Sequence, residues 1–419
     1  MHDFSFRNVD LYCEETKVAD IVEKFGTPVY IYSYRTIINH YRKLDRAFQD
    51  LEHLICYSVK ANPSLAICKA LANEGSGFDI VSGGELYRIL KIGADPQKIV
   101  FAGVGKTASE IEYALKSNIL LFNVESFSEL LLLNEIAQKL ERKAPIALRV
   151  NPDVDPGTHH YITTGRRENK FGVDLQLAPE MLEEARKLPG IEIMGVHAHI
   201  GSQITSVEPY FIMVERVLSL IEELRRQGFN LSWMNIGGGM GIVYHDETPS
   251  TAEELAQALL PNLKKAGLKI IIEPGRFIVG NAGILVTKVL YWKKTAGKEF
   301  VIVDAGMNDL IRPALYQAYH HITPITMLSH PEVIADIVGP VCESGDFFAH
   351  DRKIRRVEPG EYLAIMSAGA YGFSMSSNYN SRPRGPEVMV INQNYYMIRE
   401  RESYLDLIDR ELVLPILQK

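Results

Sequence analysis

The residues of this chain that could do chemistry stand where short apolar runs end. Residues 55–62 read ICYSVKAN, a β-prone run that closes on a single charge, Lys60. An amine held at the mouth of an apolar site is desolvated, so its pKa falls and it can form a Schiff base with a carbonyl. A strand-end lysine that only reaches water is commoner, so Lys60 alone decides nothing.

Three further groups of residues could likewise either do chemistry or have an ordinary structural role. Glu273 ends the strand-like run Lys269–Glu273 and needs a partner, for which a protonated pyridine nitrogen would serve. His197 and His199 face the same side of a strand, and such a pair could bind a metal, pack in the core or lie flat against an aromatic cofactor. The turn NIGGGMG (235–241) fails the dinucleotide pattern G-x-G-x-x-G because Ile242 stands in the last position, but its glycines suit a phosphate as well as a structural turn.

These features converge on one cofactor. A Schiff-base lysine, a carboxylate for a ring nitrogen, a stacking imidazole and a phosphate-binding turn are together what pyridoxal 5′-phosphate (PLP) requires. The residues therefore predict a PLP site without a metal.

Alternating strand-like and helix-like segments would position these residues. The strand-like runs are Leu54–Val59, Phe78–Val81, Lys98–Phe101, Ile119–Asn123, Pro145–Val150, Ile191–Ile200, Leu231–Ile236 and Lys269–Glu273. Helix-like segments follow the first seven, for example Pro63–Asn73, Gly84–Ile92, Ala108–Lys116, Ser126–Arg142 and Val207–Gln227. Strands separated by helices pair in parallel, so the pattern predicts an α/β fold, a (β/α)8 TIM-type barrel, with a doubly wound open sheet as the alternative.

In such a barrel the chemistry lies at the C-terminal ends of the strands. The residues that fall there are Lys60, Asp79, Arg149, His197, His199, Gly201 and Ser202, with the turns 235–241 and 271–277. We therefore expect one site at that end of the barrel.

After Asn281 the chain changes to β-like runs separated by Gly and Pro turns, which predicts a mostly antiparallel, β-barrel-like domain. We assign residues 34–280 to the PLP-binding barrel and 281–419 to the β domain. Residues 1–33 are expected to pack with the β domain, although the run Thr27–Ser33 could instead pair with the first barrel unit. Cys342, in the loop GPVCESGD, is the cysteine best placed for chemistry.

Composition narrows the class of protein. The chain has 419 residues, a net charge of −7 and no basic tract, which argues against nucleic acid or an anionic membrane as a partner. It has no long apolar run and no signal-peptide pattern, and its four cysteines form no C-x-x-C pair. We expect a cytoplasmic enzyme.

Longer motifs resemble a known family. In chain order they are YSVKAN, GFDIVSGGEL, HAHIGSQI, NIGGGMGI, EPGRFIVGNAG, MNDLIRPALY, CESGD and GAYGFSMSSNYNSRPRGPEV. Together they resemble the diaminopimelate decarboxylases, within the alanine-racemase-like and ornithine-decarboxylase-like class of PLP enzymes. YSVKAN and EPGR are shared across that class, whereas MNDLIRPALY with NYNSRPR is similar to the diaminopimelate branch. The resemblance implies a barrel, a C-terminal β domain and a homodimer with shared active sites.

The resemblance also implies residue roles. Lys60 resembles the Schiff-base lysine, His199 the ring-stacking histidine and Glu273 the partner of the pyridine nitrogen, whereas His197 does not match the motif. Cys342 resembles the proton donor, and in this class it comes with Glu343 from the neighbouring subunit. The implied catalytic residues are Lys60, Cys342 and His199. The implied cofactor-binding residues are Lys60, Asp79, Arg149, His199, Ser202, Gly238, Gly239, Glu273, Gly275, Arg276 and Tyr371, and the implied substrate-binding residues are Arg276, Arg312, Tyr316, Glu343 and Tyr371.

The implied reaction is the last step of lysine biosynthesis, a carboxy-lyase reaction in which meso-2,6-diaminopimelate loses CO2 and becomes L-lysine. A decarboxylase of ornithine, arginine or another polyamine precursor on the same fold is the first competing hypothesis. The residues also leave open a racemase, a metal-dependent barrel hydrolase that uses His197 and His199, and a non-catalytic homologue that binds a partner protein. The presence of Lys60 and Cys342 argues against a non-catalytic homologue.

Overall fold

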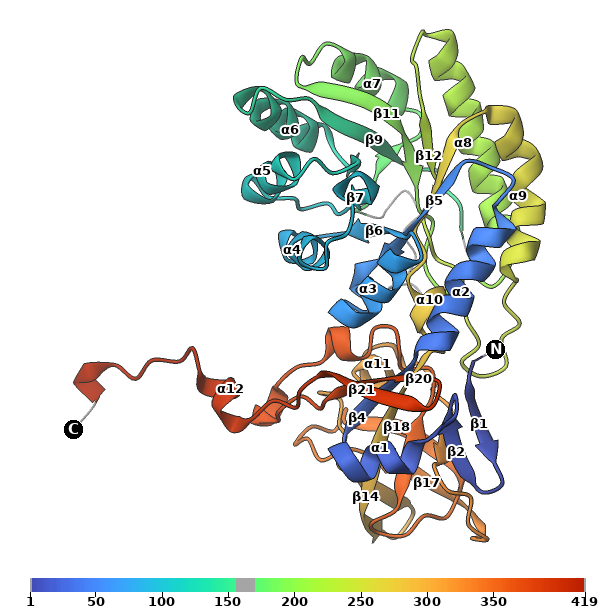
Figure 1. The fold of residues 1–419 in the computed structure, drawn as a ribbon, viewed down its shortest axis with the longest axis vertical. Coiled ribbons are helices and arrows are strands. Elements are labelled where there is room, and N and C mark those ends of the chain that lie inside the picture. The colour runs from blue at the N-terminus through green and yellow to red at the C-terminus, as the bar shows by residue number, and fades with distance from the viewer. Residues whose placement is uncertain (1, 156–169, 418–419) are drawn as a thin grey trace. The chain divides into compact units, whose positions relative to one another are not determined.

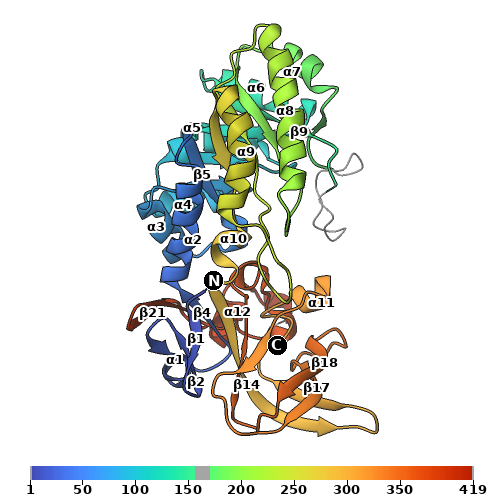
Figure 2. The same ribbon diagram turned by 90° about the vertical axis from the view of Figure 1, so that its right-hand side faces the viewer.

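The chain divides into two units in the computed structural model, which describes residues 2–155 and 170–417 (Figure 1, Figure 2). One unit is Ile37–Val279, and the other joins Met1–Thr36 to Gly280–Lys419. The predicted domains also span residues 1, 156–169 and 418–419, which lie outside the described part of the chain.

Eight parallel strands close into a barrel in the first unit. β13 hydrogen-bonds to β5 and β8 to β9, so the ring has no open edge. The predicted (β/α)8 barrel is confirmed, and the alternative of an open doubly wound sheet is wrong. A short extra strand, β10 (Val173–Asp174), pairs in parallel with β9. The barrel strands are β5 (His53–Ser58), β6 (Gly77–Ile80), β7 (Ile99–Phe101), β8 (Leu121–Val124), β9 (Ala144–Asn151), β11 (Ile191–Ala198), β12 (Trp233–Asn235) and β13 (Lys269–Ile272).

Helices cover the outside of these strands (Figure 1). Every residue of β6, β7 and β8 is buried, because the helices cover the outer face of the barrel and side chains fill its interior. Side-chain oxygens of Ser82, Thr107, Ser126 and Thr251 each accept a hydrogen bond from a backbone N–H in the first turn of a helix, which fixes where those helices begin. The helices are α2 (Tyr34–Ala47), α3 (Leu65–Asn73), α4 (Gly83–Lys91), α5 (Ala108–Lys116), α6 (Phe127–Lys139), α7 (Ala178–Arg186), α8 (Glu208–Arg226), α9 (Ala252–Ala266) and the four-residue α10 (Arg276–Val279).

The second unit is built on a mostly antiparallel sheet, as predicted. Its strands lie in the order β18-β17-β15-β14-β4-β20-β21, with β19 joining β14 to β16. Among the described residues of this unit, only the β15–β17 and β4–β20 pairs are parallel. The strands are β4 (Val29–Ser33), β14 (Gly283–Lys294), β15 (Glu299–Val303), β16 (Ile322–Pro324), β17 (Glu332–Val338), β18 (Phe347–Arg355), β19 (Tyr362–Ile365), β20 (Glu387–Ile391) and β21 (Asn394–Arg399), with helices α1 (Val18–Phe25), α11 (Arg312–Tyr316) and α12 (Tyr404–Ile408).

The N-terminal strand β4 belongs to this sheet. It pairs antiparallel with β14 on one side and parallel with β20 on the other. All five of its residues are buried, so each edge needs a hydrogen-bonding partner. The expectation that Thr27–Ser33 could pair with the first barrel unit is therefore wrong.

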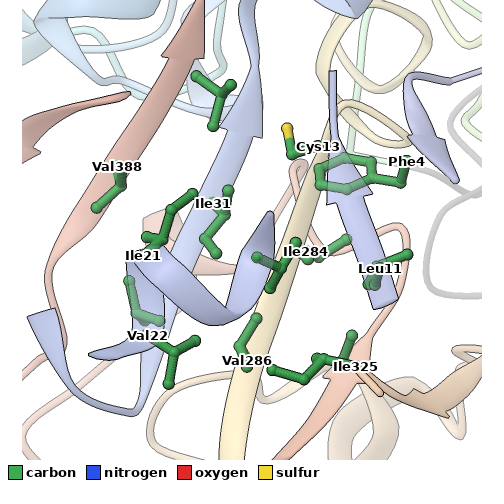
Figure 3. Close-up of a cluster of buried hydrophobic side chains, with 14 of the residues drawn as sticks. Phe4, Leu11, Cys13, Ile21, Val22, Ile31, Ile284, Val286, Ile325 and Val388 are labelled. Carbon is green, nitrogen blue, oxygen red and sulfur yellow. The ribbon is translucent and has the colours of Figure 1, made fainter. Parts of the chain in front are cut away.

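One hydrophobic cluster ties the N-terminal segment to the sheet (Figure 3). The small sheet of β1 (Phe4–Arg7), β2 (Asp10–Cys13) and β3 (Thr16–Lys17) contributes Phe4 and Leu11, and α1 contributes Ile21. These side chains pack with Ile31 of β4 and Ile284 of β14.

Among the helices in the described ranges, none is long and apolar enough to cross a membrane.

Candidate active site

A buried carboxylate holds the amine of Lys60 at the end of the first barrel strand. β5 ends at Ser58, and a single 3-10 turn (Val59–Ala61) carries Lys60. Lys60 Nζ donates to Asp79 Oδ2 at 2.5 Å, and Ser58 Oγ donates to the same oxygen at 2.7 Å. Burial raises the pKa of Asp79, an effect that the Lys60 charge opposes. The side chain of Lys60 is 41% exposed while that of Asp79 is fully buried, so a reactive amine is fixed where a small molecule can reach it.

Glu273 lies just after the eighth strand with partners from three other strands. Its Oε1 accepts from Asn235 Nδ2 at 2.6 Å and from Asn123 Nδ2 at 3.1 Å, and its Oε2 is 3.3 Å from His197 Nε2. Burial alone would raise the pKa of Glu273, but the charge of His197, the charge of Lys60 and the Asn235 hydrogen bond together hold it far below its ordinary value. Glu273 is therefore ionised, as a partner of a protonated ring nitrogen must be.

His197, which the sequence places at this end of the barrel without a role, is part of this site, and so are the two asparagines, which the sequence did not single out. The signal that could have found them is polarity, because each is a buried polar residue on an otherwise apolar strand. Their spacing gives no sign of the contact, since Asn123 is 150 residues from Glu273. His197 faces a carboxylate, and the described residues contain no group of three or more His, Cys, Asp and Glu side chains that could hold a metal ion.

His199 follows the sixth strand as a neutral imidazole. Its Nδ1 accepts a hydrogen bond from the backbone N–H of Gly238 at 3.2 Å. Burial, followed by the charges of Arg149 and Lys60, holds the pKa of His199 well below its ordinary value. A neutral ring whose Nδ1 accepts must carry its proton on Nε2.

Arg149 is held by a carboxylate that the sequence did not single out. Its Nη1 donates to Glu125 Oε1 at 2.8 Å, and the same oxygen accepts from the N–H of Gly103 at 3.0 Å. Both side chains are buried, so the guanidinium is fixed at the end of β9 close enough to affect the titration of His199.

The glycine turn after the seventh strand is required first by packing. Gly237 and Gly239 have φ of +67° and +102°, which side chains rarely adopt. A Cβ on Gly238 would overlap the carbonyl oxygen of Glu273, and one on Gly239 would overlap that of Gly201. On Gly275 a Cβ would lie 3.1 Å from two side-chain carbons.

Arg276 lies next to this turn and is held by hydroxyl groups. Its Nη1 contacts Tyr244 Oη at 2.6 Å, and its Nη2 donates to Ser202 Oγ at 3.1 Å. The barrel end thus presents a cation and a hydroxyl beside a glycine-rich backbone, which is the donor set that a phosphate needs.

These residues fit PLP. Glu273 is ionised, His199 is neutral, and Lys60 is poised on a carboxylate whose second oxygen, Asp79 Oδ1, is buried with no hydrogen-bond partner among the described residues. A positively charged, planar cofactor with a phosphate would match this set of charges.

The remaining predicted residues lie in the other unit. Arg312 is buried at the start of α11, with its Cζ 5.8 Å from the ring centre of Tyr316. Cys342 and Glu343 are exposed in the loop before β18; the Cys342 N–H donates to Asn380 Oδ1 at 2.8 Å. Tyr371 lies in the loop after β19 with φ of 56°.

Glu85 adds a titrating carboxyl group that the sequence did not reveal. Its Oε2 accepts from the N–H of Val81 at 2.8 Å. Burial raises the pKa of Glu85 from 4.5 to about 7, against the opposing effects of that hydrogen bond and the Lys60 charge. The folded chain then binds more protons than the unfolded chain between these two values, so this group makes stability fall as pH rises through that window.

We predict that Glu85→Gln flattens this pH dependence. Between about pH 5 and about pH 8 the thermal unfolding midpoint of the wild type should fall further than that of the variant, because glutamine does not titrate. The exposed Glu253, changed to Gln, is the control and should track the wild type. Parallel curves for wild type and Glu85→Gln would contradict the raised pKa.

Comparison with known proteins bears directly on these residues. Residues 34–280 match the family described as pyridoxal-dependent decarboxylase, pyridoxal binding domain. The chain is 52% identical over 408 residues to a diaminopimelate decarboxylase of Aquifex aeolicus, covering 97% of each.

Solved structures of diaminopimelate decarboxylases also match this chain. Diaminopimelate decarboxylase from Helicobacter pylori complexed with L-lysine matches with a TM-score of 0.91 and 46% identity, over 94% of this chain and 98% of that one. The M. jannaschii enzyme in co-complex with L-lysine matches with a TM-score of 0.95 and 39% identity over 100% of both chains. Since the likeness covers the barrel and the β unit alike, the chain belongs to the diaminopimelate decarboxylase family of pyridoxal-dependent decarboxylases.

Proposed function

We propose that this protein removes CO2 from the D-configured centre of meso-2,6-diaminopimelate and releases L-lysine. The observation that carries the proposal is the 52% identity, along nearly the whole chain, to a diaminopimelate decarboxylase. The ionised Glu273, the neutral His199 and the poised Lys60 at one end of the barrel support it.

The barrel residues would hold PLP, the cofactor of this family. When bound, PLP supplies an electron-withdrawing ring that takes up the electron pair left as CO2 departs. Glu273 would stabilise a proton on the ring nitrogen, and His199 would lie against the ring face as an uncharged surface. Ser202, Arg276 and the turn at Gly238 and Gly239 would bind the phosphate.

Lys60 and Cys342 would act directly on the cofactor and on the substrate. Lys60 would hold the cofactor covalently, and Asp79, which accepts a hydrogen bond from Lys60 Nζ, would keep that amine in place when it is free of the cofactor. The Cys342 thiol would donate its proton to the carbon that has lost CO2, which replaces the carboxylate by hydrogen and leaves a thiolate to be reprotonated by solvent.

Four residues would read the far end of the substrate. Diaminopimelate ends in a whole amino-acid head, which carries both signs of charge. We propose that Arg276 and Arg312 bind the distal carboxylate with Tyr316 beside them, and that Glu343 accepts from the distal ammonium. An ornithine or lysine substrate would present only an ammonium and leave arginine charge unpaired.

A side-by-side assay tests this assignment. CO2 release is measured from meso-diaminopimelate, L-lysine, L-ornithine and L-arginine. One lost charge-assisted hydrogen bond costs roughly 1.5–3 kcal/mol, so we expect diaminopimelate to be preferred by a factor of about 10 to about 150. Equal turnover of ornithine or arginine would favour the polyamine-type decarboxylase instead.

We further propose a homodimer in which Cys342 and Glu343 act in the active site of the second copy. Both residues are exposed on the single chain. The segment from α12 onward extends away from the sheet (Figure 1), and its apolar residues Leu405, Leu412, Ile416 and Leu417 are exposed. Such exposed apolar surface is typical of an interface.

The unpaired thiols Cys13, Cys56 and Cys68 support a reducing, cytoplasmic location.

Mixing two inactive variants tests the shared site. Lys60→Ala subunits mixed with Cys342→Ala subunits should regain up to about a quarter of the wild-type activity, because one of the two sites in each hybrid dimer has both groups intact. No recovery after confirmed subunit exchange would show that each chain supplies both groups to its own site.

A further inference from the structure

His320 contacts the arginine that is proposed to read the distal carboxylate. Arg312 Nε lies 3.4 Å from His320 Nε2, and both side chains are buried, with exposed fractions of 7% and 0%. The two residues meet because Gln317, the residue that follows α11, has the left-handed conformation (φ 53°, ψ 31°), which stops the helix and redirects the chain toward His320. We infer that His320 is a positioning residue that sets the orientation of Arg312, an inference that rests on the proposed function.

The hydrogen bonds of the imidazole determine which nitrogen faces the arginine. His320 Nδ1 lies 2.8 Å from the carbonyl oxygen of Met366, and a carbonyl can only accept, so Nδ1 carries the proton. In the neutral ring Nε2 is then a lone-pair acceptor, and the N–H of Arg312 Nε donates to it. A protonated ring would instead place a second cation against the guanidinium.

Two strands hold the imidazole in this position. Met366 directly follows β19, and Arg352 of β18 donates from Nη1 to the carbonyl oxygen of His320 at 2.8 Å. The Arg352 guanidinium also lies over the ring of Tyr319, with Cζ 4.1 Å from its centre. His320 is thus fixed through both its backbone and its side chain.

This arrangement has a consequence for ligand binding. Because Nε of Arg312 is directed at His320, the plane of the guanidinium is set before a ligand arrives, and a carboxylate would be bound through the Nη atoms. A guanidinium fixed in advance loses less conformational entropy on binding. Without the imidazole, ligands that carry a distal carboxylate should bind more weakly, whereas ligands without one should not be affected.

Two substitutions separate the functions of the ring. His320→Gln places an amide oxygen near the position of Nε2 and keeps an acceptor for Arg312. His320→Asn keeps a donor near Nδ1 for Met366 but has no group that reaches Arg312. His330→Asn, at a partly exposed histidine of the same unit, is the matched control.

The readout is competitive inhibition by two amines of equal chain length. L-lysine and 1,5-diaminopentane both present a terminal amine, but only L-lysine has the distal carboxylate. In the holoenzyme, His320→Asn should weaken inhibition by L-lysine roughly 3- to 10-fold, the effect of one buried hydrogen bond, and leave inhibition by diaminopentane within about 2-fold. His320→Gln and His330→Asn should keep L-lysine inhibition within about 3-fold of wild type.

A double variant tests whether His320 acts through Arg312. Arg312→Ala combined with His320→Asn should bind L-lysine no more weakly than Arg312→Ala alone. The inference is overturned if His320→Asn weakens both amines equally, if it weakens neither, or if the two substitutions add. A wild type that releases CO2 from diaminopimelate in the same experiment keeps these outcomes distinct from a failure of the proposed function.

Discussion

Replacing Lys60 by alanine should lower the turnover of diaminopimelate by a factor on the order of 10³ or more, since the amine that would hold the cofactor covalently is lost. The borohydride-reducible bond between the protein and PLP should disappear with it. Lys60 lies at the end of a strand with its side chain 41% exposed, outside the packed interior of the barrel, so the variant should still fold.

The folding cost of this variant should depend on pH. Without the amine, the pKa of Asp79 rises further because burial is no longer opposed by a charge at 2.5 Å. Lys60→Ala should therefore lose more stability at high pH than at low pH, and adding Asp79→Asn should remove that difference. The exposed Lys69, changed to Ala, is the control. A full-occupancy reducible bond in Lys60→Ala would show that another lysine binds the cofactor.

Glu273→Gln should have the second largest effect. Glutamine keeps the shape of the side chain but removes the charge that a protonated ring nitrogen needs. Losing one partner of a buried, hydrogen-bonded charge pair costs about 2–5 kcal/mol, so kcat should fall by a factor between about 30 and about 5,000. Circular dichroism should show the wild-type fold.

Glu129 supplies the matched control for Glu273. It is also a buried carboxylate of the barrel unit, and it pairs with Lys106 at 2.6 Å. Glu129→Gln should reduce stability without a comparable loss of kcat, because Glu129 hydrogen-bonds to Lys106 and to the backbone N–H of Glu125 and not to the side chains around Glu273. A Glu273→Gln enzyme within about threefold of wild type would contradict the role assigned to this carboxylate.

The barrel could be predicted from sequence because its units are local. Each strand and its following helix lie within about 30 residues, so apolar runs and capping residues such as Thr107 and Thr251 mark them directly. The strand ends then place Lys60, Asp79, Arg149, His199 and Glu273 at one end of the barrel, where the structure has them.

Long-range pairings could not be predicted in the same way. β4 pairs with β14 and β20, which lie about 250 and 360 residues further along, and no local pattern encodes that choice. The partners of Glu273 and the contact between Arg312 and His320 arise for the same reason, because tertiary packing brings together polar residues that look ordinary in their own segments.

The chirality of the product tests the central claim most directly. With meso-2,6-diaminopimelate as the substrate, loss of CO2 from the D-configured centre leaves the L-configured head intact, so the lysine formed should be entirely the L-enantiomer and equimolar with CO2. Chiral chromatography of the product measures this in one experiment. D-lysine or a racemic product would contradict the account, because the two arginines would then not be holding the L-configured head away from the reacting centre. An absence of CO2 would contradict the proposed decarboxylation itself.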